Sequence, residues 1–281
     1  MTDPDRPAVK CIAFDLDRTL LDSSGTLPLR NRAAIERAIA RGITIVIASG
    51  RPKCALHAET AAIPGIKYAI TGNGCAVYHL PTDSCIRSTH LKPESVEEIM
   101  RQTEKDGVTY ECFINGKAYA DRLFLADPVS FGTDARGVEY LRSTRIPVDG
   151  IAEFILKNKS SLDALDIIAG GLEQKTTIWG RIEGKIPDVY MTASTGQLLE
   201  ISAADSGKGS ALLSLLELLG ISPAEAAAFG DNDNDADMLS AVGYGIAMEN
   251  ASESCRRAAK YITASNDNCG VAEAMEKLLK I

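Results

Sequence analysis

The chain has 281 residues, a formal net charge of −8 and a pI near 5.1, and 45% of its residues are hydrophobic. This length suffices for a large core and about two domains, and the composition is that of a folded globular protein. The acidic balance argues against a general nucleic-acid binder or a binder of anionic membranes, because both need basic surfaces. A phosphate site in this chain must therefore be a local positive spot.

The sequence lacks signals for export, for membrane insertion and for disulfide bonding. The segment 1–10 is polar without a hydrophobic signal region, and apolar runs such as 43–48 are too short to span a bilayer. The seven cysteines are odd in number and form no C-x-x-C pair, so neither a disulfide framework nor a zinc site is indicated. These features predict a cytoplasmic protein with no membrane partner.

Strand and helix patterns alternate in the first third of the chain. Continuous apolar strands separated by helical segments predict a parallel sheet with both faces covered. We expect strands at 9–14, 43–48 and 67–71, a helix from 29 to its stop at Gly42, and a further helix whose first turn contains Pro52.

The middle of the chain has strands that alternate in polarity. Asn73-Gly74 and Asn115-Gly116 are strong hairpin signals. We expect strands at 108–114 and 117–122, and helices at 93–106 and near 137–143. This pattern predicts an inserted α+β domain with an antiparallel sheet, one face of which is covered by helices, at residues 82–191.

The last third returns to the alternation of the first. We expect helices at 208–219, 238–242, 251–259 and 271–279, and strands at 226–229, 244–248 and 261–263. The predicted fold is α/β, with a Rossmann-like parallel-sheet core and helices on both of its faces. Residues 1–81 and 192–281 form this core, and the α+β cap at 82–191 is inserted between them.

Two carboxylates follow the first predicted strand. Asp15 and Asp17 stand two positions apart, so an extended chain points both to one face. Such close like charges disfavour each other's ionised form unless a cation lies between them. Mg²⁺ suits this arrangement, because it takes one or two carboxylates and leaves room for phosphate oxygens. A solvated turn is the alternative for this pair taken alone.

Further polar segments fall at the same edge, where ligands of open parallel sheets bind. The turn Ser49-Gly50-Arg51 offers a hydroxyl and backbone N–H groups at an expected helix start, which favours anions. Lys208, between two glycines at another helix start, is placed to neutralise phosphate or an acidic cluster. An ordinary helix cap and a solvated lysine are the alternatives.

The segment 230–237 is the densest acidic site of the chain. It does not fit a calcium-binding EF-hand, because Ala236 and Val242 stand where that loop requires glycine and glutamate. A catalytic divalent-metal site shared with Asp15 and Asp17 fits better. In that arrangement Asp15 is placed to attack phosphorus, and Asp17 to protonate the leaving oxygen and later activate water.

These motifs together resemble those of the haloacid dehalogenase superfamily, in particular the Cof-type phosphatases with a C2-type cap. The motifs occur in the family's order as Asp15-Leu16-Asp17-Arg18-Thr19, Ser49-Gly50-Arg51, Lys208 and the segment from Gly230 to Asp235. The resemblance runs the full length of the chain. One departure is Arg18, which stands where the family usually has glycine and either points to solvent or adds charge near the substrate.

The resemblance implies a role for each motif residue. Asp15 would be the nucleophile and Asp17 the general acid and base. Mg²⁺ would be held by Asp15, the backbone carbonyl of Asp17 and Asp231, with Asp235 supporting it directly or through water. The residues expected to bind the phosphoryl group are Thr19, Ser49, Gly50, Lys208 and Asn234.

The sequence therefore predicts a Mg²⁺-dependent phosphatase for a small phosphorylated metabolite, either a sugar phosphate or a phosphorylated cofactor. A sugar phosphomutase and a non-catalytic phosphometabolite sensor are the alternatives, because a fold alone does not dictate function. The protein is expected to be a monomer or homodimer without a nucleic-acid partner. The cap is expected to set substrate specificity.

Overall fold

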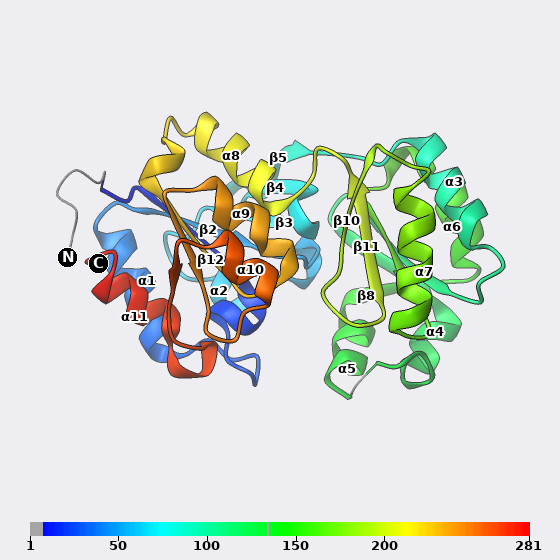
Figure 1. Cartoon of the computed structure of the whole chain (residues 1–281), viewed down its shortest axis with the longest axis horizontal. Helices are drawn as coiled ribbons and strands as arrows, with labels where there is room; N and C mark the ends of the chain where they lie inside the picture. Colours follow the sequence, from blue (N-terminus) through cyan, green and yellow to red (C-terminus); the bar gives the residue numbers. More distant parts are fainter. Residues whose placement is uncertain (1–7, 134) are drawn as a thin grey trace. The chain divides into compact units, whose positions relative to one another are not determined.

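The computed structural model describes residues 8–133 and 135–281, and the chain divides into two compact units (Figure 1). The first unit comprises Met1–Gly50, Leu56–Arg87 and Gly207–Ile281. The second comprises Arg51–Ala55 and Ser88–Ser206. These boundaries differ from the expected insertion at 82–191.

Eight strands and six helices lie in the described part of the first unit. The strands are β1 (Cys11–Phe14), β2 (Thr44–Ala48), β3 (Tyr68–Thr71), β4 (Ala76–His79), β5 (Ser84–Ser88), β12 (Ala226–Gly230), β13 (Tyr244–Ala247) and β14 (Tyr261–Ile262). The helices are α1 (Leu29–Ala40), α2 (Ala58–Ala61), α8 (Lys208–Leu218), α9 (Ala236–Ala241), α10 (Glu253–Ala258) and α11 (Gly270–Lys277). The strands form one sheet in the order β14-β13-β12-β1-β2-β3-β4-β5.

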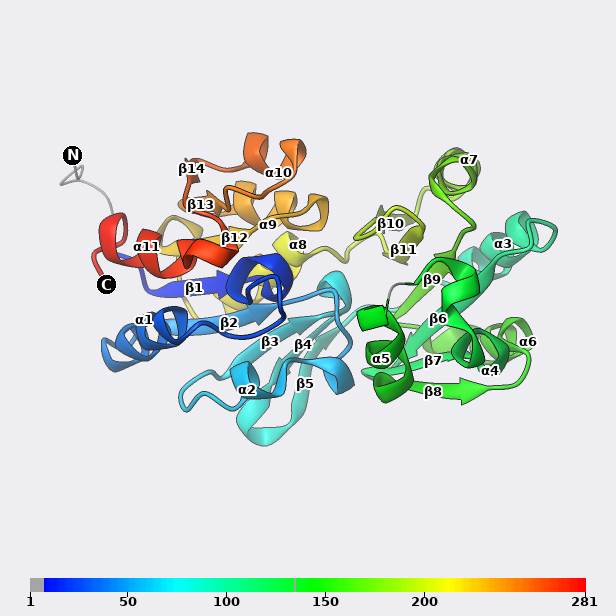
Figure 2. The ribbon, with the colours of Figure 1, turned by 90° about the horizontal axis from the view of Figure 1, so that it is seen from below.

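The pairs from β14 through to β3 are parallel, and β4 turns back antiparallel to β3. The central strand β1 is buried along its whole length between β12 and β2. Figure 2 shows β1 to β5 lying side by side. The carboxyl ends of β12, β1, β2 and β3 therefore share one edge, as the apolar pattern of these strands predicts.

Both faces of this sheet are packed against helices. Ile12 and Phe14 point to the face that buries residues of α1 and α11. The alternate residues Cys11 and Ala13 point to the opposite face, which packs on α8, α9 and α10. Phe14 stacks on Phe229 of β12 with ring centroids 5.1 Å apart. This doubly covered parallel sheet confirms the predicted Rossmann-like core.

The second unit has six strands and five helices in its described part. The strands are β6 (Thr109–Ile114), β7 (Lys117–Asp121), β8 (Arg145–Val148), β9 (Ala164–Ile168), β10 (Val189–Thr192) and β11 (Leu198–Ala203). The helices are α3 (Pro93–Thr103), α4 (Arg122–Ala126), α5 (Ala135–Thr144), α6 (Ile151–Lys157) and α7 (Leu172–Glu183). The sheet order is β10-β11-β9-β6-β7-β8.

All neighbouring strands in this second sheet are antiparallel except β7 and β8. Helices α3, α6 and α7 cover one face. A smaller cluster joins α4 and α5 to Ala120 and Ile168, whose side chains alternate to the other face. Because β10 pairs with β11, both strands belong to this sheet, and the expected boundary at residue 191 falls inside it.

Both Asn-Gly signals mark hairpins in the structure. Asn73-Gly74 lies in the turn between the antiparallel strands β3 and β4. Asn115-Gly116 joins β6 to β7, and Ile114 pairs with Lys117 across it. Asn115 and Gly116 both have positive φ, 52° and 73°, which is the backbone of the tight hairpin turn that this dipeptide favours.

The helix expected from Pro52 is wrong. The chain there forms only a three-residue 3₁₀ turn, Lys53–Ala55, and α2 starts later, at Ala58. The N-cap of α2 is His57, whose Nδ1 accepts from the backbone N–H of Thr60. Segment Arg51–Ala55 belongs to the second unit, where the Cys54 N–H donates to the Gly116 carbonyl, so tertiary contacts prevail over the helix signal.

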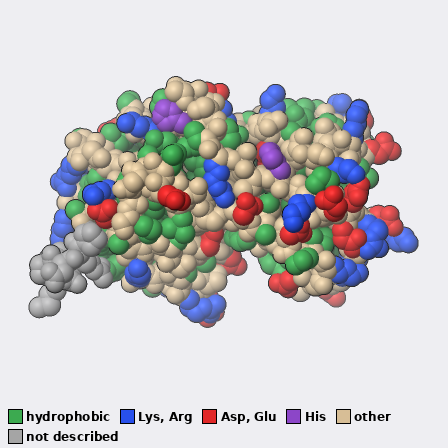
Figure 3. All heavy atoms as spheres, turned by 90° about the horizontal axis from the view of Figure 1, so that it is seen from above, with side chains coloured by type: hydrophobic (Ala, Val, Ile, Leu, Met, Phe, Trp, Pro, Cys, Tyr) green, Lys and Arg blue, Asp and Glu red, His purple; other side chains and the backbone are tan. Residues whose placement is uncertain are grey.

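Charged side chains of both signs are mixed on the surface. On the face drawn in Figure 3, acidic and basic side chains are interspersed among polar and apolar ones. Within the described residues, no helix combines the length and the apolar character that crossing a bilayer demands.

Asn31 on α1 ties the helix to two other segments of the first unit. Its fully buried side chain donates to the Leu20 carbonyl at 2.9 Å and accepts from the Ala272 N–H at 3.1 Å. Asn31→Ala leaves both groups buried without these partners, so we expect the free energy of unfolding to fall by about 2–4 kcal/mol. Urea denaturation measures this loss.

The neighbouring Arg32 is a matched control, because its side chain forms an exposed pair with Glu36 on the same helix. Arg32→Ala is expected to change the free energy of unfolding by less than about 1 kcal/mol. Equal losses in the two variants would contradict the role given to Asn31.

Candidate active site

The site begins where β1 ends. The Asp15 N–H donates to the Phe229 carbonyl on β12 at 3.0 Å, which continues the parallel pairing by one residue. This bond fixes the backbone of Asp15 at the carboxyl edge of the sheet. Asp15 is 6% exposed, and its Oδ1 accepts a hydrogen bond from Nζ of Lys208 at 2.7 Å.

Lys208 is the buried cation of the site. It is the first residue of α8, follows Gly207 (φ 112°), and has no exposed surface. Its ammonium also donates to Oδ1 of Asp235 at 2.6 Å. Burial opposes the charged form, but the two carboxylates prevail and hold the pKa of Lys208 above its usual value. Lys208 is therefore charged at neutral pH.

Asp235 organises the turn that carries Asp231. Its Oδ2 accepts from the backbone N–H groups of Asp231 and Asn232, both at 3.0 Å. Because Oδ1 is bound to Lys208, each oxygen of Asp235 has a donor from the chain. Gly230 permits this closeness, since a Cβ there would lie 2.4 Å from the Cβ of Asp235. Asp235 thus holds in place both the ammonium of Lys208 and the turn that carries Asp231.

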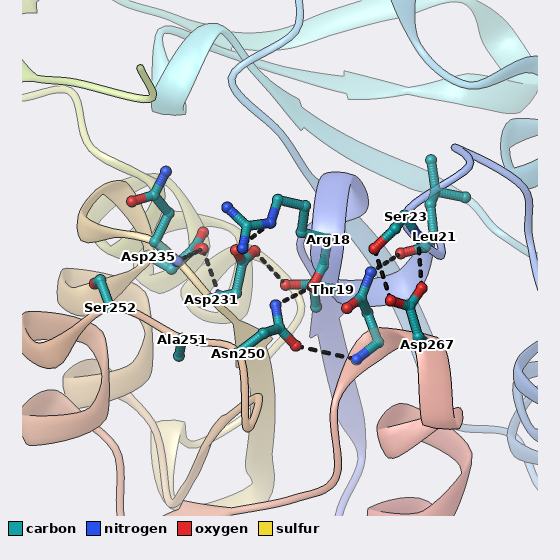
Figure 4. A network of polar contacts seen from close by, with 12 residues as sticks. Arg18, Thr19, Leu21, Ser23, Asp231, Asp235, Asn250, Ala251, Ser252 and Asp267 are labelled. Atoms are coloured by element: carbon teal, nitrogen blue, oxygen red, sulfur yellow. Dashed lines mark hydrogen bonds and ion pairs between the residues drawn. The ribbon is translucent and has the colours of Figure 1, made fainter. Parts of the chain in front are cut away.

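Asp231 lies between this cluster and the turn Leu16–Leu20. Its Oδ1 accepts from the hydroxyl of Thr19 at 2.8 Å, and its Oδ2 lies 4.0 Å from Nε of Arg18 (Figure 4). Burial and the neighbouring carboxylate of Asp235 raise the pKa of Asp231 to about 7. Burial also raises the pKa of Asp15, against the opposing effect of Lys208, and nearby carboxylates add to the rise.

These carboxylates fit a divalent cation. One oxygen from each of Asp15, Asp231 and Asp235 lies within 4.8 Å of the others, and all three residues are buried. Oxygen donors of this kind suit a hard ion such as Mg²⁺. Three buried carboxylates share one buried ammonium, so negative charge remains that a bound cation would offset.

Asp17 differs from these residues because its side chain is exposed. It lies on the turn that follows Asp15, and its charge contributes to the raised pKa of Asp15. The backbone of this turn reverses at Arg18, where φ is 63°. Asp15 and Asp17 therefore lie close together in the chain, but Asp15 is buried and Asp17 is exposed to solvent.

A second group of polar residues follows β2 and β3. Asn234 donates from Nδ2 to Oδ1 of Asn73 at 2.9 Å, and the Asn73 N–H donates to the Ser49 carbonyl at 3.2 Å. Ser49 is almost fully buried. A Cβ on Gly50 would lie 2.9 Å from Oδ1 of Asn73, so glycine permits this approach. The carbonyl of Asn73 in turn accepts from the N–H of Gly207, which precedes Lys208.

Asn73 is the member of this group that the motifs did not identify as a site residue. It is 5% exposed and has a left-handed backbone, φ 52°. In the sequence, Asn73 is part of an Asn-Gly pair after the third strand, and this pair predicts a hairpin turn but no role in the site. Only the tertiary contacts with Asn234, Ser49 and Gly207 show that the turn joins the site.

Two expectations change in the structure. The hydroxyl of Thr19, expected at the phosphoryl group, is fully buried and donates to Asp231, so this side chain orients a carboxylate. Ser49 and Gly50 do not start a helix, because a 3₁₀ turn follows them, so no helix dipole supports an anion at that point. The helix that does start at this site is α8, at Lys208.

Comparison with known proteins covers the whole chain. The sequence profile of the haloacid dehalogenase-like hydrolases matches residues 12–275. The phosphatase YwpJ of Bacillus subtilis strain 168 is 31% identical over 292 residues, covering 96% of this chain and 100% of that protein. The 5-amino-6-(5-phospho-D-ribitylamino)uracil phosphatase YwtE of the same strain is 28% identical over 286 residues, covering 96% and 98%.

Solved structures give the same result for the fold. A haloacid dehalogenase-like hydrolase from B. subtilis superposes with a TM-score of 0.81 at 28% identity, covering 96% of this chain and 100% of that one. A sugar phosphatase of haloacid dehalogenase subclass IIB superposes with a TM-score of 0.83 at 23% identity, covering 97% and 100%. Both likenesses include the core and the inserted domain.

The raised pKa of Asp231 makes the stability of the metal-free protein depend on pH. An ordinary aspartate in the unfolded chain titrates near 4, and the folded value is about 7, so the folded state holds its proton more tightly. The contribution of this group is therefore present below about pH 4 and lost as pH rises through about 7. Urea denaturation in EDTA should show a steeper loss for wild type than for Asp231→Asn. The expected difference is about 2–4 kcal/mol across this range, and equal pH slopes would contradict it.

Lys208→Met should show how strongly the two buried carboxylates destabilise the fold when the ammonium is absent. Without the ammonium, Asp15 and Asp235 remain buried beside each other, and we expect the free energy of unfolding at neutral pH to fall by about 3–5 kcal/mol. The loss should shrink at acidic pH, where the carboxyls protonate. Lys10→Met, which removes an exposed pair with Glu225, is the control and should cost less than about 1 kcal/mol. A Lys208→Met loss no larger than the control would refute the buried ion-pair cluster.

Proposed function

The chain belongs to the haloacid dehalogenase-like hydrolases and is a phosphoric monoester hydrolase, and on this premise we propose a Mg²⁺-dependent phosphatase that uses Asp15 as nucleophile. Its proposed substrate is a small phosphorylated metabolite, cleaved through an aspartyl-phosphate intermediate. The observation that carries this proposal is the Asp15–Lys208–Asp235 cluster with Asp231 beside it. It combines a carboxylate nucleophile, a buried cation and a set of oxygen donors for a metal.

The first chemical step is displacement at phosphorus. A carboxylate oxygen of Asp15 forms a bond to phosphorus while the bond to the ester oxygen of the substrate breaks. Asp17 gives its proton to the departing oxygen, which leaves as an alcohol. The exposed side chain of Asp17 suits this role, because it must reach the leaving group of the substrate.

The second step hydrolyses the intermediate. Asp17, now ionised, accepts a proton from water as the water oxygen bonds to phosphorus. The bond between phosphorus and Asp15 breaks, which frees the Asp15 carboxylate and releases inorganic phosphate. Asp17 ends the cycle protonated, as it began. Atoms and charge are therefore balanced over the two steps, with one water consumed.

Charge neutralisation is the main requirement of phosphoryl transfer. Asp15, Asp231 and Asp235, with the carbonyl of Asp17, are the groups that would hold Mg²⁺, which when bound offsets negative charge on the phosphoryl oxygens. Lys208 supplies a fixed positive charge at the N-terminus of α8. It also orients the Asp15 carboxylate through their 2.7 Å hydrogen bond.

The remaining phosphoryl ligands in the proposal are Ser49, Gly50 and Asn234. Asn73 supports them, because it bonds to Asn234 and to the Ser49 carbonyl. We give Asn73 a positioning role, which the sequence did not predict. Thr19 acts in the same way on Asp231.

The substrate class rests on the relatives. Several similar proteins are named only as phosphatases, one is named for a phosphorylated ribitylaminouracil, and one solved structure is named a sugar phosphatase. A sugar phosphate or a phosphorylated cofactor is therefore the proposed substrate for this chain. We also propose a cytoplasmic monomer or homodimer, since all seven cysteines are free thiols, which is typical of a reducing compartment.

The experiment that tests this function is phosphate release from a panel of phosphorylated metabolites, with and without Mg²⁺. Asp15→Asn keeps the shape of the side chain but removes the nucleophile, so we expect kcat to fall by about three orders of magnitude or more. Asp83→Asn is the control, because Asp83 lies on an exposed turn with φ 56°, a backbone that Asn tolerates. This variant should keep wild-type activity.

Each outcome separates the candidate functions. Mg²⁺-dependent release that is lost in Asp15→Asn supports the proposal. Substantial activity in a folded Asp15→Asn variant rules out the nucleophile. Transfer of phosphate to another position of a sugar, without free phosphate, would show a mutase, and binding without turnover would show a sensor.

A further inference from the structure

Arg18 has an unusual backbone for a long side chain. Its φ and ψ are 63° and 9°, in the left-handed region that glycine adopts without cost. The chain therefore keeps a long charged side chain at a backbone conformation that disfavours it. A strained residue beside a functional site indicates a role for its side chain.

Hydrogen bonds hold the backbone at Arg18 in place. The backbone carbonyl of Arg18 accepts from Nδ2 of Asn250 at 2.9 Å, and the next residue, Thr19, donates its hydroxyl to Asp231. Figure 4 shows the Arg18 side chain extending toward Asp231 from the turn after β1. The loop therefore directs the guanidinium to one carboxylate of the acidic cluster.

That carboxylate is the one Lys208 does not reach. The ammonium of Lys208 bonds to Asp15 and Asp235, whereas Asp231 receives the Thr19 hydroxyl and lies 4.0 Å from Nε of Arg18. Asp231 is 4% exposed and the Arg18 side chain is 65% exposed. Among the described residues, Asp231 forms an ion pair with Arg18, and the exposed Asp267 is a further acidic neighbour whose pKa Arg18 helps to lower. The guanidinium of Arg18 is thus the positive charge nearest to Asp231, a buried carboxylate to which Lys208 donates no hydrogen bond.

We propose that Arg18 is a counter-ion for Asp231 that competes with the divalent cation. This inference rests on the metal site of the proposed function. A guanidinium and a divalent cation repel each other and both require the Asp231 carboxylate. Binding of the cation therefore displaces Arg18 toward solvent, where most of its side chain already lies. Arg18 lowers the metal affinity of the site by this competition.

Isothermal titration with Mg²⁺ alone tests the competition without any substrate. Arg18→Gly removes the charge and suits the left-handed backbone, and Arg18→Asn removes the charge with a residue that also tolerates this backbone. Both variants should bind Mg²⁺ about three- to tenfold more tightly than wild type. Arg18→Lys keeps the charge and should stay closer to wild type. The gain in the neutral variants should decrease as ionic strength rises, because salt screens exposed charges.

Arg32→Gln is the matched control, since it removes an arginine of the same unit that pairs with Glu36 on the surface of α1. It should leave Mg²⁺ affinity unchanged. Equal affinity in wild type and both neutral variants would overturn the inference, and so would a gain in Arg18→Gly alone, which would assign the effect to the backbone. Absence of Mg²⁺ binding in folded wild type would instead overturn the metal site of the proposed function, and this inference with it.

Discussion

The ammonium of Lys208 is the interaction on which the site depends. It connects the end of β1, the start of α8 and the turn after β12 through Asp15 and Asp235, and it is fully buried. Burying charges is costly, so a cluster of this kind is stable only if its members stay in hydrogen-bonding geometry. The backbone donors on Asp235 and the sheet contact of Asp15 provide this geometry. The same cluster orients the carboxylate of Asp15, the proposed nucleophile.

Electrostatic balance explains why the remaining polar residues lie where they do. One lysine contacts two carboxylates, and Asp231 adds a third that Lys208 does not contact. Burial, together with the charge of Asp235, raises the pKa of Asp231, and the three carboxylates suit a divalent cation. Arg18 and Thr19 contact Asp231 from the turn that also carries Asp17. The proposed nucleophile, acid and metal ligands are thus coupled through one charge cluster.

Local sequence signals predicted the core better than the inserted unit. Buried strands such as β1 and β2 are continuous apolar runs, and both Asn-Gly turns form their hairpins. Several strands were not predicted. Strands β5, β8 and β10 are short and exposed or partly exposed, whereas β9 and β11 are buried strands in the inserted unit that the sequence analysis did not identify. The Pro52 helix signal failed because segment 51–55 bonds to the β6–β7 turn instead of continuing as a helix. Short segments adopt the structure that their long-range contacts favour.

The sequence by itself determined the chemistry that is available: carboxylates at the ends of strands, a lysine at the start of a helix, and the parallel order that collects strand ends at one edge. These features depend on local pattern, which a single chain displays. Only the tertiary structure decided how the groups pair. That Thr19 orients Asp231, that Asn73 supports Asn234, and that Lys208 reaches Asp235 and Asp15 but not Asp231 are contacts between distant segments. Hydrogen bonds and ion pairs depend on distances of a few tenths of an ångström, and packing of the whole unit sets those distances.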